Sequence, residues 1–216
     1  MIRKYSAELI GTFTLVFCGT GAVIINDVSG GAVTQVGIAI TFGLIVLAMI
    51  YAVGDISGAH INPAVTFGFA VTGRLNKKEI LPYCIAQCAG AFFASLILSG
   101  LFPQSPNLGA TIPAGSDMQS FVLEIILTFF LMFVILNVSS GAKEKGITAG
   151  IAIGAVVGLE AMFAGPICGA SMNPARSLAP AIVSGNFNSL WVYMTAPFIG
   201  AAMAALAHYF IAGKKQ

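Results

Sequence analysis

The sequence contains the tripeptide Asn-Pro-Ala twice, and this pair is the feature whose residue types and spacing indicate a function. The two copies are Asn62-Pro63-Ala64 and Asn173-Pro174-Ala175. Asparagine is a strong N-cap residue, and proline is favoured at the first helical position, where its missing N–H costs nothing. Each copy therefore predicts the start of a short helix, over about 66–73 and 176–184.

Two such helix starts that meet would favour one kind of chemistry. The side-chain oxygens of Asn62 and Asn173 can cap the helices, which leaves the NH₂ groups to donate to a passing oxygen. Each helix N-terminus also carries about half a positive elementary charge, which repels cations. The non-helical segments 57–61 and 168–172 can present backbone carbonyls as acceptors. The pattern predicts a pore for small uncharged hydrogen-bonding solutes that excludes cations and protons.

The rest of the chain has the composition of a membrane protein. Of its 216 residues, 57% are hydrophobic and only 8% are charged, whereas soluble domains carry about 25% charged residues. Together with a net charge of only +2, this composition excludes a soluble enzyme, a disordered chain and a nucleic-acid-binding domain. A bilayer-spanning helix needs about 20 mostly apolar residues. Six stretches qualify: 6–26, 34–53, 82–102, 119–138, 147–165 and 190–212.

The two Asn-Pro-Ala motifs lie in other apolar segments, 57–72 and 168–184, which glycine and proline interrupt. Irregular backbone at membrane depth is tolerated only where it lines a polar cavity or is buried in protein. We therefore predict an all-α membrane protein with six transmembrane helices plus two re-entrant half-helices, and we expect the function to lie in the half-helices.

The two halves of the chain resemble each other. Ala7-Glu8-Leu9-Ile10-Gly11-Thr12-Phe13 is similar to Leu123-Glu124-Ile125-Ile126-Leu127-Thr128-Phe129, and Gly-Ala-x-x precedes each Asn-Pro-Ala. Two ordinary helix starts would explain a single Asn-Pro-Ala, but not two copies placed alike. Each half has three spans, so the second half must be inverted. We expect a single channel domain over 1–216, with inverted 3+3 repeats over about 5–103 and 119–212.

The basic residues predict the orientation of the chain in the membrane. Nine of the ten fall on one face: Arg3, Lys4, Arg74, Lys77, Lys78, Lys143, Lys145, Lys214 and Lys215. By the positive-inside rule this face and both termini are cytoplasmic. The short termini favour a multi-pass protein of the cell inner membrane, the plasma membrane.

The tenth basic residue, Arg176, follows the second motif where the first motif has Val65. A guanidinium is expensive at this depth, so we expect it to face water and to be held by carbonyls on the outer side of the pore. A structural salt bridge, with Glu160 close in sequence, is the alternative.

These features together resemble the aquaporins, which form the major intrinsic protein family. The resemblance covers nearly the whole chain and rests on the paired motifs, on Arg176 and on the equivalent Glu8 and Glu124. It implies a right-handed six-helix bundle, a homotetramer and one pore in each subunit. It also implies a passive channel for water.

The resemblance implies a selectivity filter of four residues: Phe42, Ala161, Ala170 and Arg176. Members that pass water alone usually have histidine at the position of Ala161, so two alanines predict a wider filter, while the Phe42 ring narrows it. The run 164–178 resembles the nodulin-like subgroup and its bacterial relatives. That subgroup implies water together with small neutral solutes such as glycerol, urea and metalloid acids, including boric and arsenous acid.

The remaining polar residues have predicted supporting roles. By the same resemblance, Glu8 and Glu124 accept backbone N–H groups from the re-entrant loops, although an acid in a membrane can also relay protons. We expect His60 to brace its loop, and Glu160 to face the protein and to hydrogen-bond loop backbone. We expect Cys168 to lie near the outer vestibule, where mercurials could reach it.

Two other kinds of function stay open. Ion-coupled secondary transporters of small neutral solutes also use inverted repeats and broken helices, and a structural membrane protein could keep a vestigial pore. An enzyme is not expected, because no nucleophile with its base and no phosphate loop is present. Cys84 and Cys88 are best explained as packing residues, so we expect no metal and no cofactor. The expected partners are the permeant solutes, the lipid bilayer and identical subunits, and not nucleic acid.

Overall fold

The computed structural model describes residues 1–139 and 143–212, without the side chains of 143–147. Within these ranges every element of regular secondary structure is a helix, which confirms the predicted all-α fold class. The helices are α1 (Ile2–Val28), α2 (Thr34–Ser57), α3 (Pro63–Val71), the 3₁₀ turn η1 (Lys77–Glu79), α4 (Ile80–Leu101), α5 (Asp117–Val138), α6 (Lys143–Cys168), α7 (Pro174–Ser184) and α8 (Leu190–Ala212).

Six of these helices are long and apolar enough to cross a membrane: α1, α2, α4, α5, α6 and α8. They are the six predicted spans: α8 has the predicted bounds, and the other five differ from the prediction by a few residues at one or both ends. Their outer faces carry large apolar side chains, and Leu159, Phe163 and Phe210 are each at least 65% exposed. Such a surface suits a hydrocarbon solvent rather than water.

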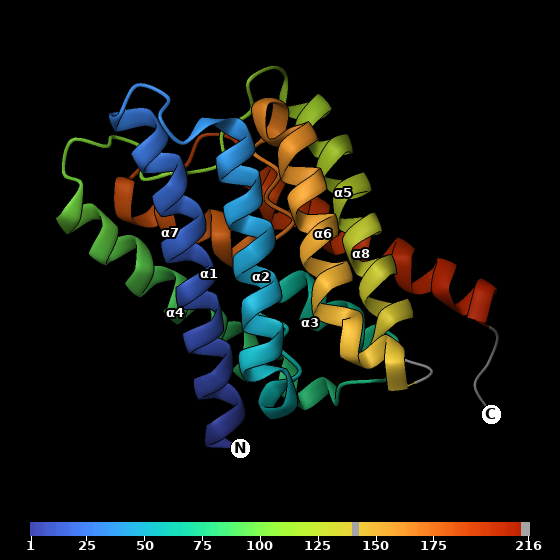
Figure 1. Ribbon diagram of the computed structural model, residues 1–216. Helices are drawn as coiled ribbons and strands as arrows, with labels where there is room; N and C mark the ends of the chain where they lie inside the picture. Colours follow the sequence, from blue (N-terminus) through green and yellow to red (C-terminus); the bar gives the residue numbers. More distant parts are fainter. Residues whose placement is uncertain (140–142, 213–216) are drawn as a thin grey trace.

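The half-helices α3 and α7 begin directly at their prolines, three and two residues earlier than predicted, and α3 ends at Val71 rather than at 73. The asparagine caps explain the early start, because each side-chain oxygen already fixes the first helical turn. Asn62 Oδ1 accepts from the Ala64 N–H at 2.8 Å, and Asn173 Oδ1 accepts from the Ala175 N–H at 3.0 Å. In Figure 1, α7 lies in the upper part of the bundle and α3 in the lower part.

The long helices of the two halves pack in matching ways. A Cβ added at Gly90 of α4 would overlap the carbonyl oxygen of Leu9 in α1, and a Cβ added at Gly200 of α8 would overlap that of Ile125 in α5. The helix backbones therefore touch at these glycines. Leu9 and Ile125 occupy equivalent places in the sequence repeat, so the packing repeats with the sequence.

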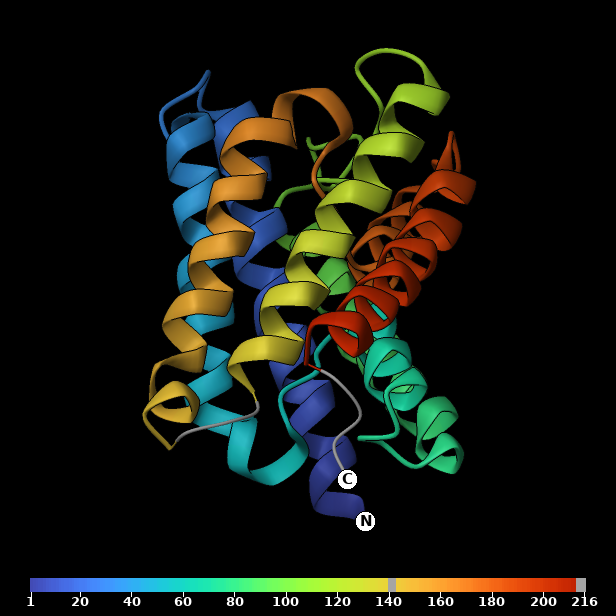
Figure 2. The same cartoon turned by 90° about the vertical axis from the view of Figure 1, so that its right-hand side faces the viewer.

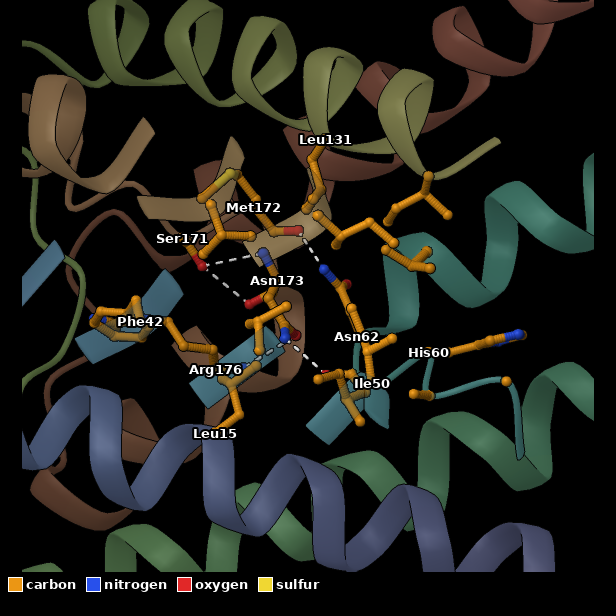
Figure 3. Close-up of a pocket in the computed structure, with 18 of the residues that line it drawn as sticks. Leu15, Phe42, Ile50, His60, Asn62, Leu131, Ser171, Met172, Asn173 and Arg176 are labelled. Atoms are coloured by element: carbon orange, nitrogen blue, oxygen red, sulfur yellow. Dashed lines mark hydrogen bonds between the residues drawn. The ribbon is translucent and has the colours of Figure 1, made fainter. Parts of the chain in front are cut away.

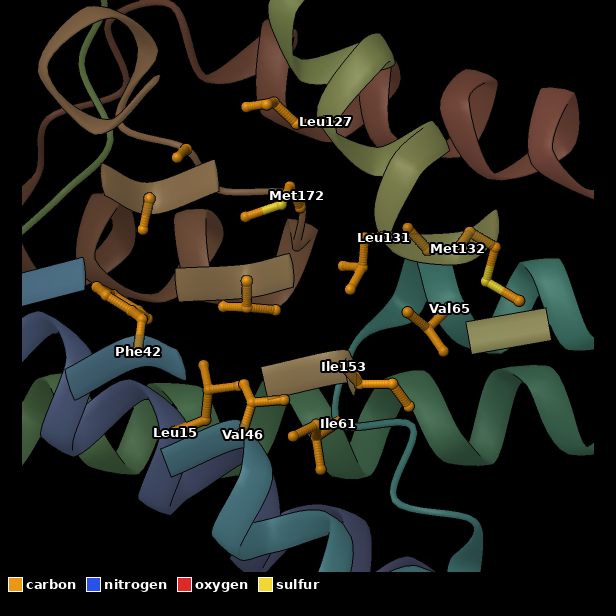
Figure 4. Packing of buried hydrophobic residues seen from close by; sticks show 14 of the residues in the cluster. Leu15, Phe42, Val46, Ile61, Val65, Leu127, Leu131, Met132, Ile153 and Met172 are labelled. Atoms are coloured by element: carbon orange, nitrogen blue, oxygen red, sulfur yellow. The ribbon is translucent and has the colours of Figure 1, made fainter. Parts of the chain in front are cut away.

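Apolar side chains from both halves meet between the half-helices (Figure 4). Leu15 and Val46 of the first half and Leu131 and Ile153 of the second half belong to one buried cluster. The two halves therefore share a core, and the half-helices are held inside it.

Several predicted cytoplasmic residues lie at the same end of the bundle. The start of α1, the segment between α3 and α4, and the start of α6 are close to that end in both views (Figure 2). These segments carry Arg3 and Lys4, Arg74 to Lys78, and Lys143. Lys214 and Lys215 lie outside the described residues.

Candidate pore

A cavity of about 130 Å³ lies between the two halves of the chain. Its walls are mostly apolar and come from α1, α2, α3, α5, α6 and α7 and from the two loops that precede α3 and α7. The polar groups that reach it are few: His60, Asn62, Ser139, Ser171, Asn173 and Arg176. A largely apolar cavity with a few convergent polar groups is typical of a binding site.

The two asparagines lie next to each other at the tips of α3 and α7 (Figure 3). Asn62 Nδ2 donates to the Met172 carbonyl at 2.8 Å, and Asn173 Nδ2 donates to the Ile61 carbonyl at 2.9 Å. Each amide therefore uses one N–H to bind the opposite loop. The NH₂ groups were predicted to donate to a solute; in the structure one N–H of each group is taken by the opposite half.

The loops before the half-helices have the same unusual backbone. Gly58, Ala59 and Ile61 have φ angles of 90°, 47° and 45°, and the equivalent Gly169, Ala170 and Met172 have φ angles of 80°, 40° and 53°. Left-handed residues that are not glycine are strained and persist only where their surroundings hold them. The repeated strain shows that both loops are held in one required shape.

Two buried carboxylates hold these loops. Glu8 accepts the N–H groups of His60 at 2.9 Å and Ile61 at 2.7 Å. Glu124 accepts those of Ser171 and Met172, both at 2.7 Å. Both carboxylates are fully buried, so the contacts agree with the predicted supporting role and leave little room for a proton relay to water.

His60 lies against its own half-helix. Its Nδ1 is 3.1 Å from the Thr66 hydroxyl, and its ring stacks on Phe69 with 4.5 Å between the ring centres. The Gln87 amide joins this cluster, since its Nε2 donates to Glu8 at 2.7 Å and to the Thr66 hydroxyl at 2.9 Å. Sequence reasoning missed Gln87, although an amide in the apolar stretch 82–102 was a visible signal.

The second loop is braced differently. Ser171 and Ser177 share a hydroxyl–hydroxyl hydrogen bond of 2.5 Å, and Thr111 donates to Ser177 at 2.8 Å. Thr111 belongs to the segment between α4 and α5. Nothing in its residue types indicated a supporting role.

Arg176 is held as predicted. It is 3% exposed, and its Nη1 donates to the Gly109 carbonyl at 2.8 Å. Its guanidinium carbon lies 5.3 Å from the centre of the Phe42 ring, a cation–π distance. The carboxylate oxygens of Glu160 have no hydrogen-bond partner in the described part of the chain, so they form no direct hydrogen bond with Arg176.

The four residues predicted to form a filter all line the same cavity. Phe42 and Arg176 lie close together in Figure 3, and the side chains of Ala161 and Ala170 are only methyl groups. The Phe42 ring packs on Gly19 of α1, where an added Cβ would overlap the ring. Sequence reasoning missed both Gly19 and Gly109, because a glycine gives no chemical signal of its contacts.

Two predictions for this region are wrong. Cys168 does not lie in a vestibule: its side chain is completely buried, its Sγ faces the Ala164 carbonyl at 3.5 Å, and it does not line the cavity. Glu160 does face the protein, at 6% exposure, but it does not bond loop backbone. In the loop before α7 it is Glu124 that accepts backbone N–H groups, those of Ser171 and Met172.

Comparisons with known proteins agree with this geometry. A sequence model of the family described as "Major intrinsic protein" matches residues 1–208. The chain is 49% identical over 210 residues to "Aquaporin NIP1-3" of Oryza sativa subsp. japonica, covering 97% of this chain and 73% of that protein. It is 46% identical over 212 residues to "Probable aquaporin NIP4-2" of Arabidopsis thaliana, covering 98% and 75%.

A solved structure has the same fold. The X-ray structure of the aquaglyceroporin from Plasmodium falciparum matches with a TM-score of 0.85 and 27% sequence identity, covering 98% of this chain and 97% of that chain. The chain therefore belongs to the major intrinsic protein family, as a passive membrane channel.

Proposed function

We propose that the cavity between α3 and α7 is the pore of a passive channel for water and small uncharged solutes, and that it excludes ions and protons. The observation that carries this proposal is the meeting of Asn62 and Asn173 across the cavity, each bonded to the loop of the opposite half. Each amide keeps a second N–H for an oxygen of the solute.

The exclusion of cations follows from the charges around these tips. Two helix N-termini point at the same place, and each contributes about half a positive charge. Arg176 adds a full positive charge at the same cavity. A cation would meet this repulsion and would also lose hydration against apolar walls, whereas a neutral solute carries its own donors and acceptors.

The proposed selectivity filter consists of Phe42, Ala161, Ala170 and Arg176. Arg176 offers donors on one side, and the two alanine methyl groups leave space on the other. This combination suits water and small polyhydroxyl or amide solutes such as glycerol, urea and the metalloid acids. The solved relative from Plasmodium falciparum is an aquaglyceroporin, which points in the same direction.

The test is stopped-flow light scattering on proteoliposomes that contain the purified chain. Vesicles should shrink or swell faster than empty ones with water, glycerol and urea, with a low activation energy and without saturation. A pH gradient across the same vesicles should decay no faster than in empty ones. Saturation or dependence on an ion gradient would indicate a secondary transporter, and vesicles no leakier than empty ones would indicate a vestigial pore.

An amide-to-acid pair of variants tests the exclusion of ions directly. Asn62 and Asn76 both cap helix starts through their side-chain oxygens, at 2.8 Å and 3.0 Å from the capped N–H. Asn62→Asp places a negative charge in the cavity, whereas Asn76→Asp places the same charge outside it. Cation leakage should rise only with Asn62→Asp, and equal leakage from both variants would contradict the proposed mechanism.

The proposal extends to assembly and location. We propose a single domain over 1–216 with inverted repeats over about 5–103 and 119–212, assembled as a homotetramer with one pore in each subunit. We place it in the plasma membrane with both termini cytoplasmic, which the basic end of the bundle supports. Such a channel performs no chemical reaction and needs no cofactor. Native mass spectrometry tests the tetramer, and protease protection of tagged termini tests the orientation.

A further inference from the structure

The amide of Gln35, near the start of α2, reaches across to the backbone of α6. Its Nε2 donates to the Ala161 carbonyl at 2.7 Å. Ala161 lines the cavity next to Arg176 and Phe42, so this hydrogen bond connects α2 to the α6 wall of the proposed filter. Gln35 itself does not line the cavity and is half-buried.

Gly165, one helical turn beyond Ala161, makes room for this amide. A Cβ added at Gly165 would overlap Gln35 Nε2 and would lie 3.3 Å from its Cδ. The amide therefore occupies the space that a Cβ of residue 165 would need. Because the overlapping atoms belong to the end of a flexible side chain, a larger residue at 165 would displace the amide rather than the helix.

The contact lies where the two helices need a cross-link. Further along the pair, α2 and α6 touch directly, since a Cβ added at Gly43 would lie 2.7 Å from the Gly154 carbonyl oxygen. Towards the end of α6, Pro166 lies inside the helix and offers no N–H to the carbonyl one turn earlier. Near Pro166, the hydrogen bond of the Gln35 side chain takes the place of a direct backbone contact between α2 and α6.

These two helices carry two of the four proposed filter residues, Phe42 on α2 and Ala161 on α6. We propose that Gln35 is a positioning residue for solute selectivity: by bonding the Ala161 carbonyl over Gly165, it fixes how far the α6 wall stands from the Phe42 ring. This inference rests on the proposed function, because it assumes that the cavity conducts.

The test measures the ratio of glycerol to water permeability in proteoliposomes. Gln35→Met keeps the length but has no donor, and Gln35→Glu presents an acceptor to the carbonyl. Both should raise the ratio by about fivefold, because the net free energy of one hydrogen bond corresponds to about that factor in an equilibrium constant. Gln35→Lys restores a donor and should return the ratio to that of the wild type. The control is Gln119→Leu, an exposed glutamine near the start of α5, which should change nothing.

Gly165→Ala provides an independent route to the same effect, since its methyl group displaces the amide. It should raise the ratio as Gln35→Met does, and the double variant should go no further than either single one. Thermal unfolding should show the same lack of additivity, and this readout does not depend on conduction.

The outcomes separate the two proposals. Wild-type vesicles no leakier than empty ones would overturn the proposed function, while additive unfolding effects of Gln35→Met and Gly165→Ala would overturn the role of Gln35. Conducting variants whose ratios equal that of the wild type, or a Gln35→Lys variant that behaves like Gln35→Met, would also overturn it.

Discussion

Replacing Glu124 by glutamine should destabilise the second re-entrant loop. The carboxylate accepts two N–H groups, from Ser171 and Met172, at 2.7 Å each. Glutamine keeps one acceptor oxygen and turns an NH₂ group towards the other N–H, so one bond is lost and two donors face each other. A hydrogen bond to a charged group contributes about 1.5–3 kcal/mol, so the free energy of unfolding should fall by about 2–3 kcal/mol.

Glu160→Gln is the matched control for this prediction. Glu160 is also buried, at 6% exposure, but neither of its oxygens has a hydrogen-bond partner in the described part of the chain. Its replacement breaks no bond, so the free energy of unfolding should change by less than about 1 kcal/mol. The two variants make the same chemical change in buried positions that differ in their partners.

Thermal unfolding of the purified protein can distinguish the two variants. Trp191 is the sole tryptophan of the chain, and its Nε1 bonds Asp117 at 3.0 Å near the start of α5, so its fluorescence reports on the α5–α8 pair. For a chain of this length the Glu124 variant should unfold about 4–12 °C lower. Equal losses for Glu124→Gln and Glu160→Gln would refute the argument that the carboxylate acts through its two backbone bonds.

Three further predictions follow from the geometry. Ala161→His should fill the alanine side of the proposed filter and lower the glycerol-to-water permeability ratio by about tenfold or more in stopped-flow assays; an unchanged ratio would remove Ala161 from the filter. Mercuric chloride should not lower the water permeability by reacting with Cys168, because that thiol is fully buried. If mercury inhibited the wild type but not a Cys168→Ser variant, this prediction would be contradicted. Gly90→Ala should lower the free energy of unfolding by about 1–3 kcal/mol through overpacking, while Gly54→Ala, with open space around it, should not, as chemical denaturation can measure.

The sequence was sufficient for the features that depend on residues close together in the chain. Each Asn-Pro-Ala defines its own helix start, because the asparagine cap and the proline act within a few residues. Each transmembrane span is likewise indicated by its own run of apolar residues. Arg176 could be recognised because the equivalent Val65 made it an exception to the repeat. These predictions needed no knowledge of which helices are neighbours.

The contacts that the sequence did not reveal join residues far apart in the chain. Gln35 bonds a carbonyl 126 residues away, and Gln87 bonds a carboxylate 79 residues away. A carbonyl oxygen such as that of Gly109 is present at every residue, so its use as a partner leaves no trace in the sequence. The mistake at Cys168 has the same origin, since proximity to the filter in sequence did not show which way the thiol points.

The two halves also differ in a way that explains the supporting role of the segment between α4 and α5. Tyr83 and Tyr193 occupy equivalent positions, each bonding the carbonyl that ends the preceding span, at 2.8 Å and 2.7 Å. By the same offset, Gln87 of α4 corresponds to Pro197 of α8, and a proline side chain can donate no hydrogen bond.

The hydroxyl of the second half-helix therefore needs another donor, and Thr111 of the segment between α4 and α5 supplies it to Ser177. The same segment places the Gly109 carbonyl on Arg176. The segment between α4 and α5 thus braces the second loop and holds the Arg176 guanidinium at the cavity. This arrangement accounts for the asymmetry of a repeated fold: the half without the buried amide is the half whose brace comes from the segment between α4 and α5, and it is also the half that carries the arginine.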